Sequence, residues 1–209
     1  MIVRDTGGNF ENAPSGTHIA RCIRLIGIGT HEQTFEGQTR ARNIVIVFWE
    51  LPHEFRQDGQ PFIISKWYTR SLADRATLRK DLAQWRGRDF TSEELQAFDL
   101  KNVLDKGCQV IVTENEQGKV NVSSVAGLPK GTTLPDRHNE LQYFDVEEWD
   151  EGVFQQLSEK TQELIKKSVE HNEINQFGKV LSADERRSGS GTPSVPLVKA
   201  AGADDDIPF

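Results

Sequence analysis

The fold class of this 209-residue chain is indicated by three strand-like runs: THIARCIRLIGI (17–28), RARNIVIVFWEL (40–51) and PFIISKWYTRSL (61–72). β-Branched and aromatic residues dominate these runs, which is typical of strands on a half-buried sheet surface. Turn-forming residues separate them: Gly29 follows the first run, Pro52 follows the second, and Asp58-Gly59 precedes the third. The sequence therefore predicts three consecutive strands joined by loops.

Two more runs, at 108–113 and 119–125, flank a turn signal at 115–118 and predict a β-hairpin. Between the third and fourth strands the apolar spacing becomes helical, because Leu78, Leu82 and Trp85 recur on one face of a helix. We expect this helix to begin with Asp74 as its N-cap and to stop at Gly87.

Two short helices are expected to complete the insert. Thr91 and Glu94 have the spacing of a capping box, in which each residue bonds the backbone N–H of the other. Asp99 is the expected cap of the next helix, and Gly107 follows its end.

The order of these elements predicts a mainly β fold with helical additions. Three strands, a helical insert and a hairpin match a five-stranded Greek-key barrel of the OB-fold type, in which the helix lies between strands three and four. An SH3-like barrel or a mixed α+β sheet has the same order of elements and stays an alternative.

The second half of the chain divides into three parts. Residues 128–145 are irregular, and apolar residues from Phe154 to Val169 then recur at helical spacing, which predicts an amphipathic helix docked on the barrel or on another subunit. Residues 183–203 are rich in Ser, Gly, Pro and Ala and predict a flexible, disordered linker. We therefore expect a domain at 1–182, a linker at 183–203 and an acidic tip at 204–209.

The net charge of −7 is unevenly distributed. Residues 17–88 hold 12 basic and 7 acidic residues, residues 89–145 hold 5 and 10, and residues 146–209 hold 7 and 13. The acidic total therefore excludes a uniformly basic nucleic-acid binder, but a locally basic barrel remains compatible with an anionic polymer.

No apolar run approaches the ~20 residues of a membrane-spanning helix, and no secretory signal is apparent, so we expect a cytoplasmic protein that does not bind membranes. Cys22 and Cys108 lie in strand-like runs and are expected to be buried, unpaired thiols. No dinucleotide loop, phosphate-binding loop or nucleophile elbow occurs, so we expect neither catalysis nor a cofactor or metal.

The chain ends in an anionic run followed by Ile, Pro and an aromatic residue bearing the carboxylate. An apolar pocket with a basic rim is the kind of partner site that such a segment fits. The expected partner-binding residues are Asp204, Asp205, Asp206, Ile207, Pro208 and Phe209.

This hexapeptide resembles the C-terminal tip of bacterial single-stranded DNA-binding proteins. The resemblance implies an OB-fold, a low-complexity linker and a role in DNA replication, recombination and repair in the bacterial cytoplasm. It also implies recruitment of exonuclease I, the chi subunit of DNA polymerase III, a primosomal helicase and recombination mediators. The long insert and the extra C-terminal helix make the body more similar to a bacteriophage-encoded OB-type protein, so the bacterial assembly and DNA-contacting positions are not carried over.

Binding to single-stranded DNA without sequence specificity requires cations for phosphates and exposed aromatic rings for bases. Strand three alternates such residues, strand two carries two arginines near its start, and the insert helix carries three more. Trp49 and Trp67 are equally consistent with core positions. The candidate DNA-binding residues are Arg40, Arg42, Trp49, Lys66, Trp67, Tyr68, Arg70, Arg75, Arg79 and Arg86.

Two other functions remain open. The chain could be an adaptor that recruits host enzymes through the tip without touching DNA, or a metal-dependent nuclease using Glu50, Glu54 and Asp58. A homo-oligomer is also compatible with the apolar stripe of the C-terminal helix.

Overall fold

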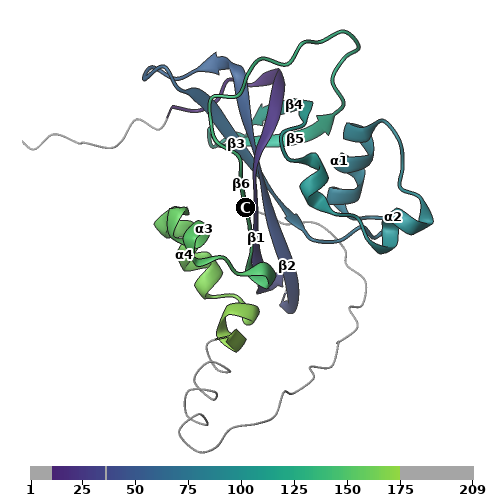
Figure 1. Cartoon of the computed structure of the whole chain (residues 1–209), viewed down its shortest axis with the longest axis vertical. Helices are drawn as coiled ribbons and strands as arrows, with labels where there is room; N and C mark the ends of the chain where they lie inside the picture. Colours follow the sequence, from purple (N-terminus) through teal and green to yellow (C-terminus); the bar gives the residue numbers. More distant parts are fainter. Residues whose placement is uncertain (1–10, 36, 175–209) are drawn as a thin grey trace, which may run out of the picture.

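The computed structural model describes residues 11–35 and 37–174 (Figure 1). The expected linker at 183–203 and the acidic tip at 204–209 lie outside these residues, as does the end of the expected 1–182 domain. The described chain is mainly β, with one six-stranded sheet and a few short helices. None of the helices in this part of the chain is long and apolar enough to span a membrane.

The three predicted N-terminal strands are present and antiparallel: β1 (Gly16–Phe35), β2 (Gln38–Phe55) and β3 (Pro61–Thr69). β1 and β2 are longer than predicted, because the polar residues after Gly29 continue to pair with those before Ile44. Polar residues on both strands leave no hydrophobic pattern in the sequence, so the outer half of this hairpin could not be predicted. β3 ends at Thr69, three residues before the predicted end at Leu72.

The predicted hairpin is formed by β4 (Gly107–Glu114) and β5 (Val120–Ala126). The strand order is β3-β2-β1-β4-β5, with antiparallel neighbours throughout. This order is consistent with an OB-like barrel that is open between β3 and β5. A sixth strand, β6 (Gln142–Asp145), runs parallel to β1 within the region predicted to be irregular.

The insert contains α1 (Thr77–Arg86), α2 (Ser92–Gln96) and the 3₁₀-helix η1 (Leu100–Val103). The stop at Gly87 is confirmed by its left-handed φ of 70°, and both halves of the Thr91 capping box are present. The Asp74 cap is a wrong prediction: α1 begins after Ala76 and has no side-chain cap, and Asp74 instead accepts a hydrogen bond from Arg79.

The predicted C-terminal helix is broken into α3 (Glu151–Gln156) and α4 (Glu159–Lys166), after the short η2 (Val146–Glu148). The break falls at Ser158, whose Oγ accepts the backbone N–H of Thr161 and so caps α4. A serine hydroxyl competes with helix continuation by bonding the backbone in this way. The apolar stripe is nevertheless used, because Phe154, Leu157 and Ile165 are all buried.

Two cores lie on opposite faces of the β1–β2–β3 sheet. The inner face packs against α1, with Trp49 and Leu51 buried among Leu78 and Leu82. The outer face is covered by residues 142–174, here called the C-terminal cap, and its core is built from Ile26, Ile28, Ile44, Ile46, Phe144, Phe154 and Ile165. Figure 1 shows α1 and α2 on one side of the long β1–β2 hairpin and α3 and α4 on the other.

Candidate nucleic-acid interface

The C-terminal cap leaves part of the outer face exposed, and Phe48 and Trp67 pack against the edge of its core. Register pairs Arg24 with Phe48 and Phe48 with Ser65, so these three side chains form a row across β1, β2 and β3. On β3, Ile63 and Trp67 lie two residues to either side of Ser65 on the same face. We call Arg24, Phe48, Ile63, Ser65 and Trp67 the open strip; Ile63 is 41% exposed, Ser65 is exposed, and the other three are half-buried.

Arg24 provides a cation within this strip. Its guanidinium carbon lies 5.2 Å from the centroid of the Phe48 ring. Its Nε is buried and bonds no acceptor among the described residues, and burial lowers the pKa of the guanidinium from its ordinary value. The buried Nε is closed to an incoming ligand, so only the rest of the guanidinium can meet one. A half-buried arginine beside an aromatic ring is suited to an anion that arrives together with a flat, apolar group.

Of the predicted DNA-binding residues, the structure brings only Trp67 to the open strip. Arg40 and Arg42 lie on the outer half of the β1–β2 hairpin, opposite Gln33 and His31. The capped residues Ile44 and Ile46 separate these arginines from the strip along β2. Arg40 is exposed and donates to Gln38 Oε1 (3.1 Å), and Arg42 is half-buried.

The structure places two other candidates in the inner core. Trp49 is 1% exposed and its ring centroid lies 6.2 Å from that of Trp85. Tyr68 is 2% exposed, and its hydroxyl donates to Asp81 Oδ2 at 2.7 Å. Neither ring therefore offers a face for stacking in this structure, and Trp49 takes the core position that its apolar strand also allowed.

Lys66 lies on the inner face of the sheet, like Tyr68, because the two residues are two positions apart on one strand. Its Nζ donates to Asp81 Oδ2 (2.8 Å) and to the backbone oxygen of Ser123 (3.3 Å). Lys66 thus links β3 to α1 and to β5 across the open side of the barrel. Burial, and then the neighbouring Asp81 carboxylate, raise the pKa of Tyr68 well above its ordinary value.

The arginines of the insert mostly bind carboxylates of the same domain. Arg79 pairs with Asp74 (2.5 Å) and with Asp89 (3.4 Å). Arg86 pairs with Glu94, and its guanidinium also lies over the ring of Phe90. These two cations therefore hold the insert together, whereas Arg75 is exposed on the surface.

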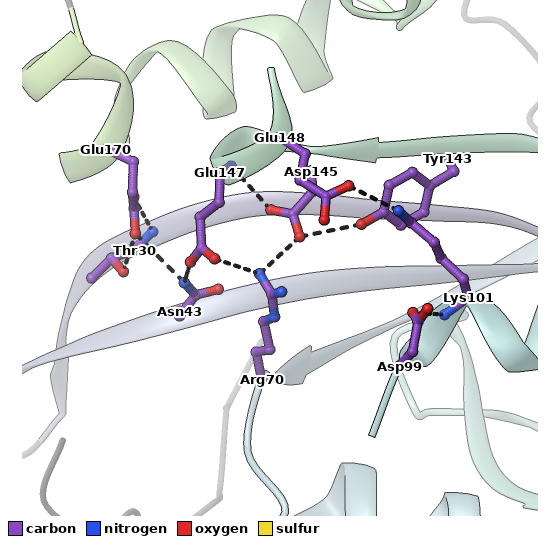
Figure 2. A network of polar contacts seen from close by, with 10 residues as sticks. All are labelled: Thr30, Asn43, Arg70, Asp99, Lys101, Tyr143, Asp145, Glu147, Glu148 and Glu170. Atoms are coloured by element: carbon purple, nitrogen blue, oxygen red, sulfur yellow. Dashed lines mark hydrogen bonds and ion pairs between the residues drawn. The ribbon is translucent and has the colours of Figure 1, made fainter. Parts of the chain in front are cut away.

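Arg70 belongs to a polar seam that fastens the C-terminal cap to the sheet (Figure 2). Its Nη1 lies 2.9 Å from Asp145 Oδ2 and 3.5 Å from Glu147 Oε2. At the other end of the seam, the backbone N–H and hydroxyl of Thr30 donate to the Glu170 carboxylate at 2.7 and 2.6 Å.

Gly29 allows this close approach, because a Cβ at this position would lie 2.6 Å from Glu170 Oε2. Its φ of +85° is also a conformation that residues with a side chain rarely adopt. The contact between Thr30 and Glu170 therefore depends on Gly29. The sequence analysis predicted only that Gly29 ends the first strand.

A cavity of about 320 Å³ adjoins the seam. Its floor is apolar, with Leu25 and Leu82 among its lining residues. Its charged lining residues are Arg70, Asp99, Asp145 and Glu148. Three carboxylates against one cation disfavour a phosphate here, so the open strip is the better candidate for DNA.

The carboxylates considered for a nuclease are engaged elsewhere. Glu50 is fully buried and accepts backbone N–H bonds from His138 and Asn139. Glu54 lies 3.1 Å from His18, and Asp58 lies 2.7 Å from Arg56. Within residues 11–35 and 37–174 no three His, Cys, Asp or Glu side chains are grouped so as to hold a metal ion.

Comparison with known proteins found no relative. No family model, no curated protein and no solved structure matches this chain.

Proposed function

We propose that the protein binds single-stranded DNA without sequence specificity through the open strip of an OB-like barrel. The observation that carries this proposal is the pairing of Arg24 with Phe48: a half-buried cation lies over a half-buried aromatic ring at the edge of the cap. A phosphate contacts the guanidinium, and a base stacks on the apolar surface beside it.

The position of the strip agrees with the barrel topology. OB-folds bind oligonucleotides on the face of strands two and three, between the loops that join strands one to two and four to five. Phe48 lies on β2 and Trp67 on β3, and the long β1–β2 hairpin continues from the same face. Arg40 and Arg42 on that hairpin extend the basic surface for phosphates beyond the cap.

Stacking explains both the preference for single strands and the absence of sequence specificity. Every base has a π-face, so a flat aromatic platform accepts all four bases. A base inside a duplex is stacked on its neighbours and presents no free face to the sheet. The protein is thus expected to coat exposed strands during replication, recombination and repair.

Direct competition tests this function. A labelled dT15 strand is bound to the protein and then challenged with unlabelled dT15, with mixed-sequence single strands or with a duplex of the same length. Both single strands should compete equally, and the duplex should compete at least tenfold less well. Failure to bind any strand would favour the adaptor that recruits enzymes without touching DNA.

We further propose that the tip, Asp204 to Phe209, recruits genome-maintenance enzymes to the coated strand. Its acidic residues, proline and terminal aromatic residue support this, as does the Ser- and Gly-rich stretch before it. Removing Phe209 should abolish capture of such enzymes while leaving affinity for dT15 equal or higher. Capture can be measured with immobilised protein and exonuclease I; capture equal to that of the full chain would contradict this role.

A further inference from the structure

A second aromatic surface lies on the outer face beyond the open strip. Phe55, at the end of β2, is 49% exposed although its ring is large and apolar. It pairs with Pro61 on β3, and Ile63, Ser65 and Trp67 follow Pro61 on the same face. Pro61 is buried, whereas Ile63 and Ser65 are exposed and Trp67 is half-buried, so Phe55 stands beyond the Ile63 end of the open strip.

His138 contributes a second ring to this surface. The ring centroids of Phe55 and His138 lie 5.6 Å apart, with the ring planes at 76° to each other. His138 is exposed and comes from the loop between β5 and β6, about eighty residues later in the chain. No pattern in the sequence brings these two residues together.

The buried carboxylate of Glu50 fixes that loop. Glu50 is fully buried, on β2, and accepts the backbone N–H of His138 (3.0 Å) and of Asn139 (2.8 Å). The Asn139 side-chain amide donates to the same carboxylate at 2.6 Å, and Arg21 donates to the backbone oxygen of Pro135 at 2.5 Å. The loop is thus anchored to β1 and β2, and His138 is held against Phe55.

We propose that Phe55 and His138 form a second stacking site for the DNA strand that binds at Arg24 and Phe48. This inference rests on the proposed function and extends it by assigning a path along β3. Ser65, which is paired with Phe48, lies four residues from Pro61, which is paired with Phe55, a separation of about 13 Å at ~3.3 Å per residue. A single strand covers that distance in a few nucleotides, so one strand can reach both sites.

Continuity with the open strip argues for DNA as the occupant. Ile63 is 41% exposed and lies on β3 between the two stacking sites, so it provides an apolar surface between them. A second copy of the chain or a partner protein would cover the same residues, and the test below separates these occupants from DNA.

The test compares Phe55→Ala with Val169→Ala, a control on the cap whose side chain is similarly exposed at 42%. With dT15, Phe55→Ala should weaken binding at least fivefold, the lower end of what one base-stacking contact contributes. With dT2, which is too short to span both sites, the affinity should stay within twofold of the original chain. Val169→Ala should match the original chain on both strands.

A photocrosslink gives a readout independent of affinity. A dT15 strand carrying 5-iodouracil at each position in turn should crosslink to peptides containing Phe55 or His138 at some positions and to peptides containing Phe48 or Trp67 at others.

The outcomes distinguish the two proposals. If the original chain binds dT15 and Arg24→Met weakens it while Phe55→Ala does not, the second stacking site is overturned and the proposed function stands. If Phe55→Ala abolishes self-association in sedimentation without changing DNA affinity, the surface belongs to a second copy and the inference is also overturned. If the original chain binds no strand, both proposals fail.

Discussion

Replacing Arg24 with methionine should weaken DNA binding without weakening the fold. Methionine keeps an unbranched apolar stem against Phe48 and removes the charge. In the folded protein, Arg24 has a buried Nε that bonds no acceptor among the described residues, and such a group destabilises the fold by about 1–3 kcal/mol. The substitution removes this group and so relieves that destabilisation. It also removes the cation–π contact with Phe48, which contributes about 0.5–1 kcal/mol at an exposed site.

The free energy of unfolding should therefore stay the same or rise by up to about 2 kcal/mol. A lost charge-assisted hydrogen bond to phosphate should cost about 1.5–3 kcal/mol of binding, or roughly 10- to 150-fold in Kd for dT15. Urea unfolding measures the first quantity and fluorescence anisotropy of labelled dT15 measures the second. Suppose instead that the free energy of unfolding of the variant falls by more than about 1 kcal/mol while its Kd for dT15 is unchanged. Arg24 would then serve the fold, and this reasoning would be refuted.

Two further predictions concern the scaffold. Asp81→Ala should lower the free energy of unfolding in urea by about 3–5 kcal/mol, because it leaves the donors of Lys66 and Tyr68 without their acceptor. The control Asp58→Ala, at an exposed ion pair, should lower it by less than about 1 kcal/mol. Equal losses in the two variants would contradict the role of Asp81. The hydrogen bond from Arg88, followed by that from the Thr91 backbone, lowers the pKa of Glu94 from 4.5 to about 2, so its stabilising effect is present above pH 4.5 and is lost as the pH falls towards 2. Glu94→Gln should therefore flatten the fall in stability between pH 4.5 and 2, and a pH profile parallel to that of the original chain would contradict this.

Local signals in the sequence were sufficient for most of the elements. β-Branched runs between turn residues gave the five main strands, and the Thr91-x-x-Glu94 spacing gave a real capping box. β6 was missed because a four-residue strand has no readable period, and its place is decided by parallel pairing with β1 more than a hundred residues earlier. Ser158 broke the expected C-terminal helix because its hydroxyl bonds the backbone, a choice that the apolar spacing does not reveal.

The candidate site was harder to predict because alternation along a strand does not say which face is buried. Lys66 and Tyr68 face inward because Asp81, on a helix that follows β3, supplies their common acceptor. Arg24 was missed although the sequence carried a signal, a lone cation within the apolar run CIRLIGI. Its significance depends on the register that places it beside Phe48 and on a cap whose core reaches Phe48 but leaves it half-buried.

A titration of tryptophan fluorescence with dT15 at several salt concentrations tests the central claim most directly. Trp67 on the open strip should be quenched as the strand binds. If Arg24, Arg40 and Arg42 each contact a phosphate, the logarithm of the association constant should fall with the logarithm of salt concentration with a slope of about −2. The absence of quenching, or an affinity that does not change with salt, would contradict the proposal that this face binds single-stranded DNA.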